Sequence, residues 1–290
     1  MSLLPITFEE EAASYKCRIT RDDYSKRVRV DDYYGDVQEV VKFAVMKAEQ
    51  WKCEKLIMKV RNEDLSIFIE KDFILEAMVD KYFSGNTMYF MCKYFSAERR
   101  KSGTWVEENK ILASVVENAA LKNNVEKPLP SQLQLKVCDA SDSSSLALLY
   151  DVVFKVYPVP MNDKDYVKKS IESGNVFLAF YDGEKAISAV CGEVNRHYHN
   201  AEITDCATLP EYRQYGLMQK LLRELENELY RNHIFCLYSI ARARSYGMNA
   251  AFSRLQYKYR GRLVNNCIIF EGMEDMNVWV KFLMCQKTGD

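Results

Sequence analysis

Residues 201–218 read as a strand, a turn and a helix, and this order constrains the fold more than any other segment. The stretch 203–209 is short, partly β-branched and closed by Pro210, which is typical of a strand. After Gly216, leucines recur at helical spacing: Leu217, Leu221, Leu222, Leu225 and Leu229. A helix that begins at a glycine turn presents unpaired N–H groups, which favours an anion such as a pyrophosphate. The alternative is a strand–loop–helix connection without a ligand, since one glycine in a turn is common.

Composition excludes several classes of protein. The 290 residues predict about two domains, and 48% hydrophobic with 28% charged residues is a globular profile. A net charge of −1 gives no basic field for nucleic acid or an anionic membrane. Apolar runs are too short to span a membrane, and the first residues are not a secretory signal.

The nine cysteines are odd in number, widely spread and include no C-x-x-C pair. This pattern predicts reduced thiols in a cytoplasmic protein, without a disulfide framework or a zinc site. The three histidines are too few for a metal cluster, so no metal is expected. His197 and His199 share an expected hairpin, where a solvated turn is the better interpretation.

The region 121–145 is rich in Asn, Pro and Ser and predicts a division near residue 130, into domains 1–130 and 131–290. The second half alternates strands and helices, which predicts a mixed α/β domain. Strands are expected at 133–138, 176–181, 185–194, 202–209, 234–241, 257–263 and 267–271, and helices at 143–156, after Gly216 and at 246–255. Asp182-Gly183 marks a hairpin turn.

The first half predicts a helix at 37–50, a strand at 55–60, a short helix at 63–70 and a hairpin, 74–82 with 88–95. Two spacings recur: Gly35 precedes Leu56 and Arg61 by 21 and 26 residues, as Gly216 precedes Leu237 and Arg242. The first half is therefore either a degenerate copy of part of the second, or the match is a coincidence. The acidic turn 31–36 should repel phosphates, so no nucleotide site is expected there.

The second half resembles the GNAT acetyltransferases, whose pattern of Gln or Arg, two residues, Gly, one residue, and Gly or Ala opens a helix that holds the pyrophosphate of acetyl-CoA. Here Arg213-Gln214-Tyr215-Gly216-Leu217-Met218 occupies that pattern, and Met218 departs from the small last residue. The resemblance implies an acyl-CoA N-acyltransferase fold after a smaller α/β domain, with acetyl-CoA as cosubstrate. The cofactor-binding residues expected from it are Thr208, Leu209, Arg213, Gln214, Tyr215, Gly216, Leu217, Met218, Asn249 and Phe252.

Several blocks resemble the β-lysine N-acetyltransferases within that family: 201–205, 207–210, 240–243, 245–249 and 276–279, with 157–161 matching after two changes. The likeness covers most of residues 135–283. It implies acetylation of the terminal amine of β-lysine, which lysine 2,3-aminomutase supplies in that pathway.

Acetyl transfer requires a neutral amine, and deprotonating a lysine-like amine at pH 7 costs roughly 4–5 kcal/mol. Glu202 lies eleven residues before Arg213, the family spacing for a catalytic glutamate, and is the expected base. Asp205 is the second candidate, although it lies on the other face of the strand unless a bulge intervenes. The usual tyrosine acid is replaced by Phe252, so Tyr246 or a water takes that role; core packing is the other interpretation of Tyr246.

β-Lysine carries two ammonium groups and one carboxylate, so its site should hold both acids and a cation. Glu193, Asp205 and Glu274 are candidates for the ammonium groups, and Arg242 or Arg244 for the carboxylate. Each arginine is equally explained as a surface charge or a contact to a CoA phosphate. Trp279 and Tyr157 are candidate walls, against ordinary aromatic packing.

Two other functions stay open at this stage. One is a GNAT enzyme acting on another small amine, such as a polyamine or lysine. The other is a non-catalytic CoA-binding protein, which the departures at Met218 and Phe252 favour. Three roles are open to the first half: shaping the pocket, covering the sheet of the second domain, or forming a homodimer contact.

Overall fold

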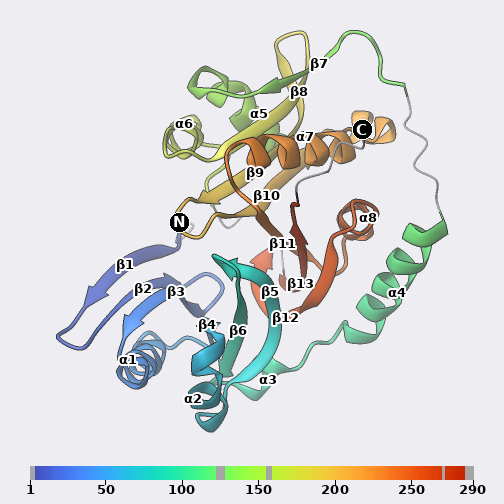
Figure 1. The fold of residues 1–290 in the computed structure, drawn as a ribbon. Coiled ribbons are helices and arrows are strands. Elements are labelled where there is room, and N and C mark those ends of the chain that lie inside the picture. The colour runs from blue at the N-terminus through green and yellow to red at the C-terminus, as the bar shows by residue number, and fades with distance from the viewer. Residues whose placement is uncertain (1–3, 122–127, 155–158, 270–271, 285–290) are drawn as a thin grey trace.

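The computed structural model describes residues 4–121, 128–154, 159–269 and 272–284 (Figure 1). The first half contains β1 (Ile6–Glu11), β2 (Tyr15–Asp22), β3 (Arg27–Gly35), α1 (Val37–Gln50), β4 (Lys55–Arg61), α2 (Leu65–Glu70), β5 (Ile74–Phe83), β6 (Asn86–Tyr94), α3 (Ala97–Arg100) and α4 (Trp105–Leu121). The second half contains β7 (Leu133–Val137), α5 (Ser143–Val153), α6 (Lys164–Glu172), β8 (Val176–Asp182), β9 (Lys185–Asn195), β10 (Asn200–Thr208), α7 (Leu217–Arg231), β11 (Cys236–Arg242), α8 (Tyr246–Arg254), β12 (Lys258–Ile269) and β13 (Gly272–Phe282).

The strands join into one mixed sheet, in the order β1-β2-β3-β4-β6-β5-β12-β13-β11-β10-β9-β8-β7. The two halves meet where β5 and β12 run antiparallel, with Gly261 opposite Ala77. A Cβ on Gly261 would lie 2.3 Å from the Glu76 carbonyl oxygen, so this close approach requires glycine. The mixed α/β prediction is confirmed, and the two halves share a single continuous sheet.

Strand order repeats between the halves. The order β1-β2-β3-β4-β6-β5 matches β8-β9-β10-β11-β13-β12, and β3–β4 and β10–β11 are both parallel pairs joined through a helix. Gly35 lies just before the connecting helix α1 and Gly216 just before α7, and both glycines adopt positive φ. The division predicted near residue 130 falls between α4 and β7, and α4 packs against α8 of the second half.

Helix α7 packs on the sheet through the leucines that its spacing predicts, and all five are buried. The leucines reach β9 at Gly192, where a Cβ would lie 3.2 Å from Leu229. Helix α5 contacts β9 and β10, and its Leu146 and Tyr150 are fully buried in the same core cluster. This packing fixes β10, the strand that carries the expected base.

The sequence prediction missed some elements and misjudged others. Strands β1, β2, β3 and β13 and helices α3, α4 and α6 were not predicted. The strands expected at 257–263 and 267–271 are one strand, β12, with two register shifts against β13. Among the described residues, no helix is long and apolar enough to cross a membrane. The eight cysteines that the structure describes are free thiols.

Candidate active site

Strands β10 and β11 separate shortly after they pair. Their parallel ladder joins Asn200 to Cys236, Ala201 to Leu237 and Glu202 to Tyr238, and no described pair follows. Beyond Glu202, β10 carries a bulge against β9 between Thr204 and Ala207, where Asp205 has φ +51°. A bulge bends a strand and redirects its side chains. The two strands therefore diverge and leave part of their facing backbone without a ladder partner.

The turn after β10 is a 3₁₀ segment, Pro210–Tyr215, followed by Gly216 with φ +66° and then α7. Gly216 is the N-cap of α7, and no side chain in the described part of the chain caps this helix. A Cβ at Gly216 would meet nothing within 4 Å, so the approach to the first-turn N–H groups is open. An uncapped 15-residue helix with an open N-terminus suits a phosphate group.

The side chains of this turn leave its backbone accessible. Leu217 is buried, and Met218 is partly buried and packs against the same core, so its bulk points away from the helix start. Arg213 donates from Nε to the Thr208 carbonyl at 3.3 Å and is exposed. Gln214 is exposed and Tyr215 is half-buried, while Leu209 is buried and donates its N–H to the Ile187 carbonyl. The segment thus combines open amides with an exposed arginine, as a pyrophosphate requires.

Three acidic residues of the second half form one electrostatic group, here called the acidic cluster: Glu193, Glu202 and Asp205. Glu193 lies directly opposite Glu202 in the β9–β10 ladder. Burial and the charges of Glu202 and Asp205 raise the pKa of Glu193 to about 8, although solvent still reaches its side chain. Asp205 is buried, and its carboxylate accepts from the Thr204 hydroxyl at 3.1 Å. Neighbouring carboxylates repel one another when they are ionised, and a bound cation relieves this repulsion, so the cluster favours cation binding.

The first half brings a basic pair toward this cluster: Arg29 of β3 and Lys59 of β4. Arg29 Nη2 lies 3.3 Å and Lys59 Nζ 3.2 Å from the carboxylate of Asp31, which both share. Burial opposes ionisation of Asp31, but the two cations hold its pKa well below the usual value. The charge of Asp31 raises the pKa of Arg29 most strongly; burial lowers this pKa, and the charge of Glu202 raises it further. Lys59 also donates to the Tyr82 hydroxyl at 3.4 Å, and the Tyr82 ring packs 5.6 Å from that of Tyr238, the β11 partner of Glu202, so this part of the first half packs against a neighbour of Glu202.

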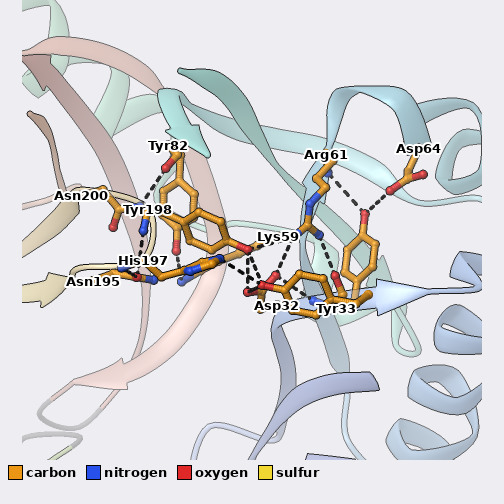
Figure 2. Close-up of polar contacts among 11 residues, drawn as sticks. Asp32, Tyr33, Lys59, Arg61, Asp64, Tyr82, Asn195, His197, Tyr198 and Asn200 are labelled. Atoms are coloured by element: carbon orange, nitrogen blue, oxygen red, sulfur yellow. Dashed lines mark hydrogen bonds and ion pairs between the residues drawn. The ribbon is translucent and has the colours of Figure 1, made fainter. Parts of the chain in front are cut away.

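A hydrogen-bond network holds the β9–β10 hairpin against the first half (Figure 2). Tyr198, near the hairpin turn, donates from its hydroxyl to Asp32 at 2.8 Å and accepts from Arg61 at 2.9 Å. Arg61 also donates to Asp32 at 2.8 Å, and Asn200 donates to the Tyr82 carbonyl at 2.9 Å. The turn is thus anchored through Tyr198, while its neighbours His197 and His199 are exposed as expected.

Other predicted site residues are engaged within the fold. Asn249 is fully buried: its amide nitrogen donates to the carbonyls of Arg242 and Ser245, and its amide oxygen accepts from Asn277 and Trp279. Trp279 is 1% exposed, and Phe252 is fully buried beside the Tyr257 ring. Asn249, Trp279 and Phe252 are thus engaged within the core, and the cofactor and substrate roles expected of them stay predictions.

The structure separates Arg242 and Glu274 from Glu202. Arg242 lies four residues beyond Tyr238, the strand partner of Glu202, which is about 13 Å along β11. Its Nη2 pairs with Glu274 at 2.7 Å, so these two predicted substrate residues neutralise each other. Arg244 lies 3.9 Å from Glu107 and is half exposed.

Tyr246 is 40% exposed at the start of α8, and its hydroxyl accepts from Asn118 of α4 at 3.2 Å. Tyr157 lies outside the described residues. Sequence reasoning missed Arg29, Asp31 and Lys59, because no local pattern links them to Glu202. In the described part of the chain, no group of three or more His, Cys, Asp or Glu is arranged to hold a metal ion.

Comparisons with known proteins agree with this geometry. The Acetyltransferase (GNAT) family pattern matches residues 145–247. The N-acetyltransferase YodP of Bacillus subtilis is 35% identical over 265 residues, covering 91% of this chain and 95% of the relative. Two proteins named beta-lysine N(6)-acetyltransferase are also similar. The one from Methanococcus maripaludis is 31% identical, covering 89% of this chain and 93% of its own, and the one from Methanosarcina mazei is 30% identical, covering 87% and 100%.

These relatives match nearly the whole chain, including the first half that supplies the basic pair. The split strands, the open helix start and the relatives identify an N-acetyltransferase that takes its acetyl group from acetyl-CoA. The chain belongs to the GNAT acetyltransferase family.

Proposed function

We propose that this enzyme transfers the acetyl group of acetyl-CoA to the terminal amine of β-lysine, giving Nε-acetyl-β-lysine. The observation that carries the proposal is the acidic cluster beside the strand split, because three neighbouring acidic side chains, whose ionisation a bound cation favours, suit an acceptor with two ammonium groups. Two relatives that match most of the chain have β-lysine in their names, which supports this choice among small amines.

Glu202 is the proposed base in this reaction. It is half-buried and is the last β10 residue that pairs with β11, so it lies where the acetyl donor would enter between the strands. Its carboxylate takes a proton from the bound ammonium, directly or through a water, and the neutral amine attacks the thioester carbonyl. A backbone N–H of the diverging β10 stabilises the oxyanion. The C–S bond then breaks, CoA leaves as its thiolate, and the proton lost by the attacking nitrogen reaches the thiolate through a water or Tyr246.

The donor binds along the turn 210–218 in this proposal. The open amides at the start of α7 hold the pyrophosphate, and Arg213 adds a charged contact. The packing of Met218 into the core leaves this binding mode intact despite the unusual residue. The protein is accordingly proposed to be catalytic rather than a CoA sensor.

The test follows thiol release from acetyl-CoA with β-lysine, lysine and spermidine as acceptors. We expect the highest kcat/KM with β-lysine; turnover of another amine in its place would overturn the substrate assignment. Glu202→Gln should lower kcat roughly 10²–10⁴-fold and preserve acetyl-CoA binding. Glu184→Gln, an exposed glutamate in the β8–β9 turn, is the control and should keep the wild-type rate. A wild-type rate in Glu202→Gln would remove this residue from the mechanism.

A further inference from the structure

Arg29 occupies in the first half the position that Glu202 occupies in the second. Val28 pairs with Leu56 in the parallel ladder of β3 and β4, and Ala201 pairs with Leu237 in that of β10 and β11. Arg29 follows Val28 as Glu202 follows Ala201. Both strands also carry a bulge a few residues later. The bulge of β3 lies where its register with β2 shifts, opposite Arg18 and Ile19, and the bulge of β10 is the one described above. The corresponding positions of the two halves therefore carry opposite charges.

The basic pair is not neutralised within its own half. Arg29 and Lys59 carry two positive charges and share one carboxylate, that of Asp31, which also accepts from the Thr20 hydroxyl at 3.2 Å. Arg29 Nε is a buried donor without a hydrogen-bond partner among the described residues. A buried unsatisfied donor is costly, and a guanidinium is suited to a carboxylate through two parallel hydrogen bonds. One excess positive charge and one unused donor thus remain.

The basic pair and the acidic cluster approach each other through two tyrosines. Lys59 Nζ donates to the Tyr82 hydroxyl at 3.4 Å, and the Tyr82 ring lies 5.6 Å from that of Tyr238, the β11 partner of Glu202. Glu202 and Glu193 both contribute to the raised pKa of Arg29. Burial alone would lower the pKa of Lys59, but Tyr82, Asp31 and Glu202 raise it. Among the described residues, no ion pair within 4.0 Å joins Arg29 or Lys59 to Glu193 or Glu202. Solvent reaches the Arg29 side chain, which is 40% exposed, and reaches Glu193.

We propose that Arg29, with Lys59 beside it, binds the carboxylate of the acceptor while the acidic cluster binds its ammonium groups. This assignment rests on the proposed function and makes the first half part of the acceptor site. It replaces Arg242 and Arg244 as carboxylate ligands. A polyamine offers no carboxylate, so the basic pair selects amino acids over polyamines of similar length. Binding energy comes from charge-assisted hydrogen bonds between that carboxylate and the solvent-accessible part of the Arg29 side chain.

The experiment compares β-lysine with its carboxamide, 3,6-diaminohexanamide, which keeps both amines and lacks the negative charge. Both are assayed by thiol release at saturating acetyl-CoA, with wild type, Arg29→Met, Arg29→Lys and Lys59→Met. Arg29→Met should lower kcat/KM for β-lysine about 10- to 100-fold and leave that for the carboxamide within about twofold. Arg29→Lys should recover part of the loss, since it keeps the charge and loses the two-pronged geometry.

Arg21→Met is the matched control. Arg21 also pairs with an aspartate two residues later, Asp23 at 2.7 Å, and its side chain is 36% exposed, but its guanidinium lies over the Trp51 ring, 5.4 Å from the ring centroid. Arg21→Met should leave kcat/KM unchanged for both β-lysine and the carboxamide. An equal fall on both substrates in Arg29→Met and Arg29→Lys, or no fall on β-lysine, would overturn the carboxylate site while the proposed function stands. A wild type that acetylates other amines but not β-lysine would instead refute the proposed function.

Discussion

Replacing Glu193 by glutamine should remove a pH dependence that the opposed carboxylates create. In the free enzyme, burial, Glu202 and Asp205 raise the pKa of Glu193 to about 8, so this side chain is mainly protonated at pH 7. A protonated glutamic acid and a glutamine are both neutral, so wild type and Glu193→Gln should behave alike at pH 6. Above pH 8 only the wild type gains a negative charge, which attracts the acceptor's ammonium group.

The size of the effect follows from that pKa. A carboxyl with a pKa of about 8 is about 1% ionised at pH 6 and about 90% ionised at pH 9. Hydrogen bonds to charged groups contribute about 1.5–3 kcal/mol, and we take the lower end because solvent reaches Glu193. The ratio of kcat/KM between wild type and variant should therefore rise from about 1 at pH 6 to about 10 at pH 9, with its midpoint near pH 8.

The assay measures kcat/KM for β-lysine by thiol release between pH 6 and pH 9.5 at saturating acetyl-CoA. The acceptor's own ionisation is common to both proteins and cancels in the ratio. Glu184→Gln serves again as control and should give a ratio near 1 at every pH. A Glu193→Gln ratio that stays constant between pH 6 and pH 9.5 would refute the reasoning.

Three further changes test the structural assignments. Gly216→Ala places a side chain at φ +66°, which should cost about 1 kcal/mol of stability and raise the KM for acetyl-CoA. Its control is Asp36→Ala, which removes the cap of α1. This change should cost a similar amount of stability and leave the KM for acetyl-CoA unchanged. Asn249→Ala removes the acceptor of two buried donors, the Asn277 amide and Trp279 Nε1, and should cost about 3 kcal/mol in denaturant unfolding. An unchanged unfolding midpoint with a raised acetyl-CoA KM would make Asn249 a cofactor ligand instead. Tyr198→Phe removes the hydroxyl that links Asp32 and Arg61 and should raise the KM for the amine more than that for acetyl-CoA; equal changes in both would count against a docking role.

Local sequence patterns predicted those helices and strands that bury one apolar face of their own. The leucine spacing of α7, the Asp-Gly turn between β8 and β9 and the helix α1 agree with the structure within a few residues. Strand β3 was missed because charged residues interrupt its apolar pattern, and the structure buries one of them with a partner: Arg27 is 6% exposed and pairs with Asp22 at 2.8 Å. Strand β13 was missed because buried polar residues such as Asn277 interrupt its apolar pattern.

The candidate site was predictable only where its residues are close in sequence. The spacing of Glu202 from Arg213 indicated a base beside a phosphate-binding turn, and the hairpin prediction already paired the segments of Glu193 and Glu202. Arg29 lies more than 170 residues before Glu202, and the two halves meet only in the folded chain, through the shared sheet, the α4–α8 contact and the Tyr198 network. Sequence alone also does not distinguish a buried asparagine that completes a hydrogen-bond network, such as Asn249, from one that binds a ligand.

The N-termini of α7 and α1 differ in a way that indicates different roles for the two halves. In α7 the N-cap is Gly216, and no described side chain occupies its amides; in α1 the N-cap Asp36 accepts from the N–H groups of Gln38 and Glu39. A carboxylate at that position both fills the amides and repels phosphates, so the first half would not bind acetyl-CoA in the manner of the second. With the matching topology, this leads us to propose that the first half is a degenerate copy. Such a copy no longer needs a base at position 29, and an arginine there is free to serve the acceptor of the other half. Acceptor specificity would then arise from both halves, while acetyl-CoA is bound by one.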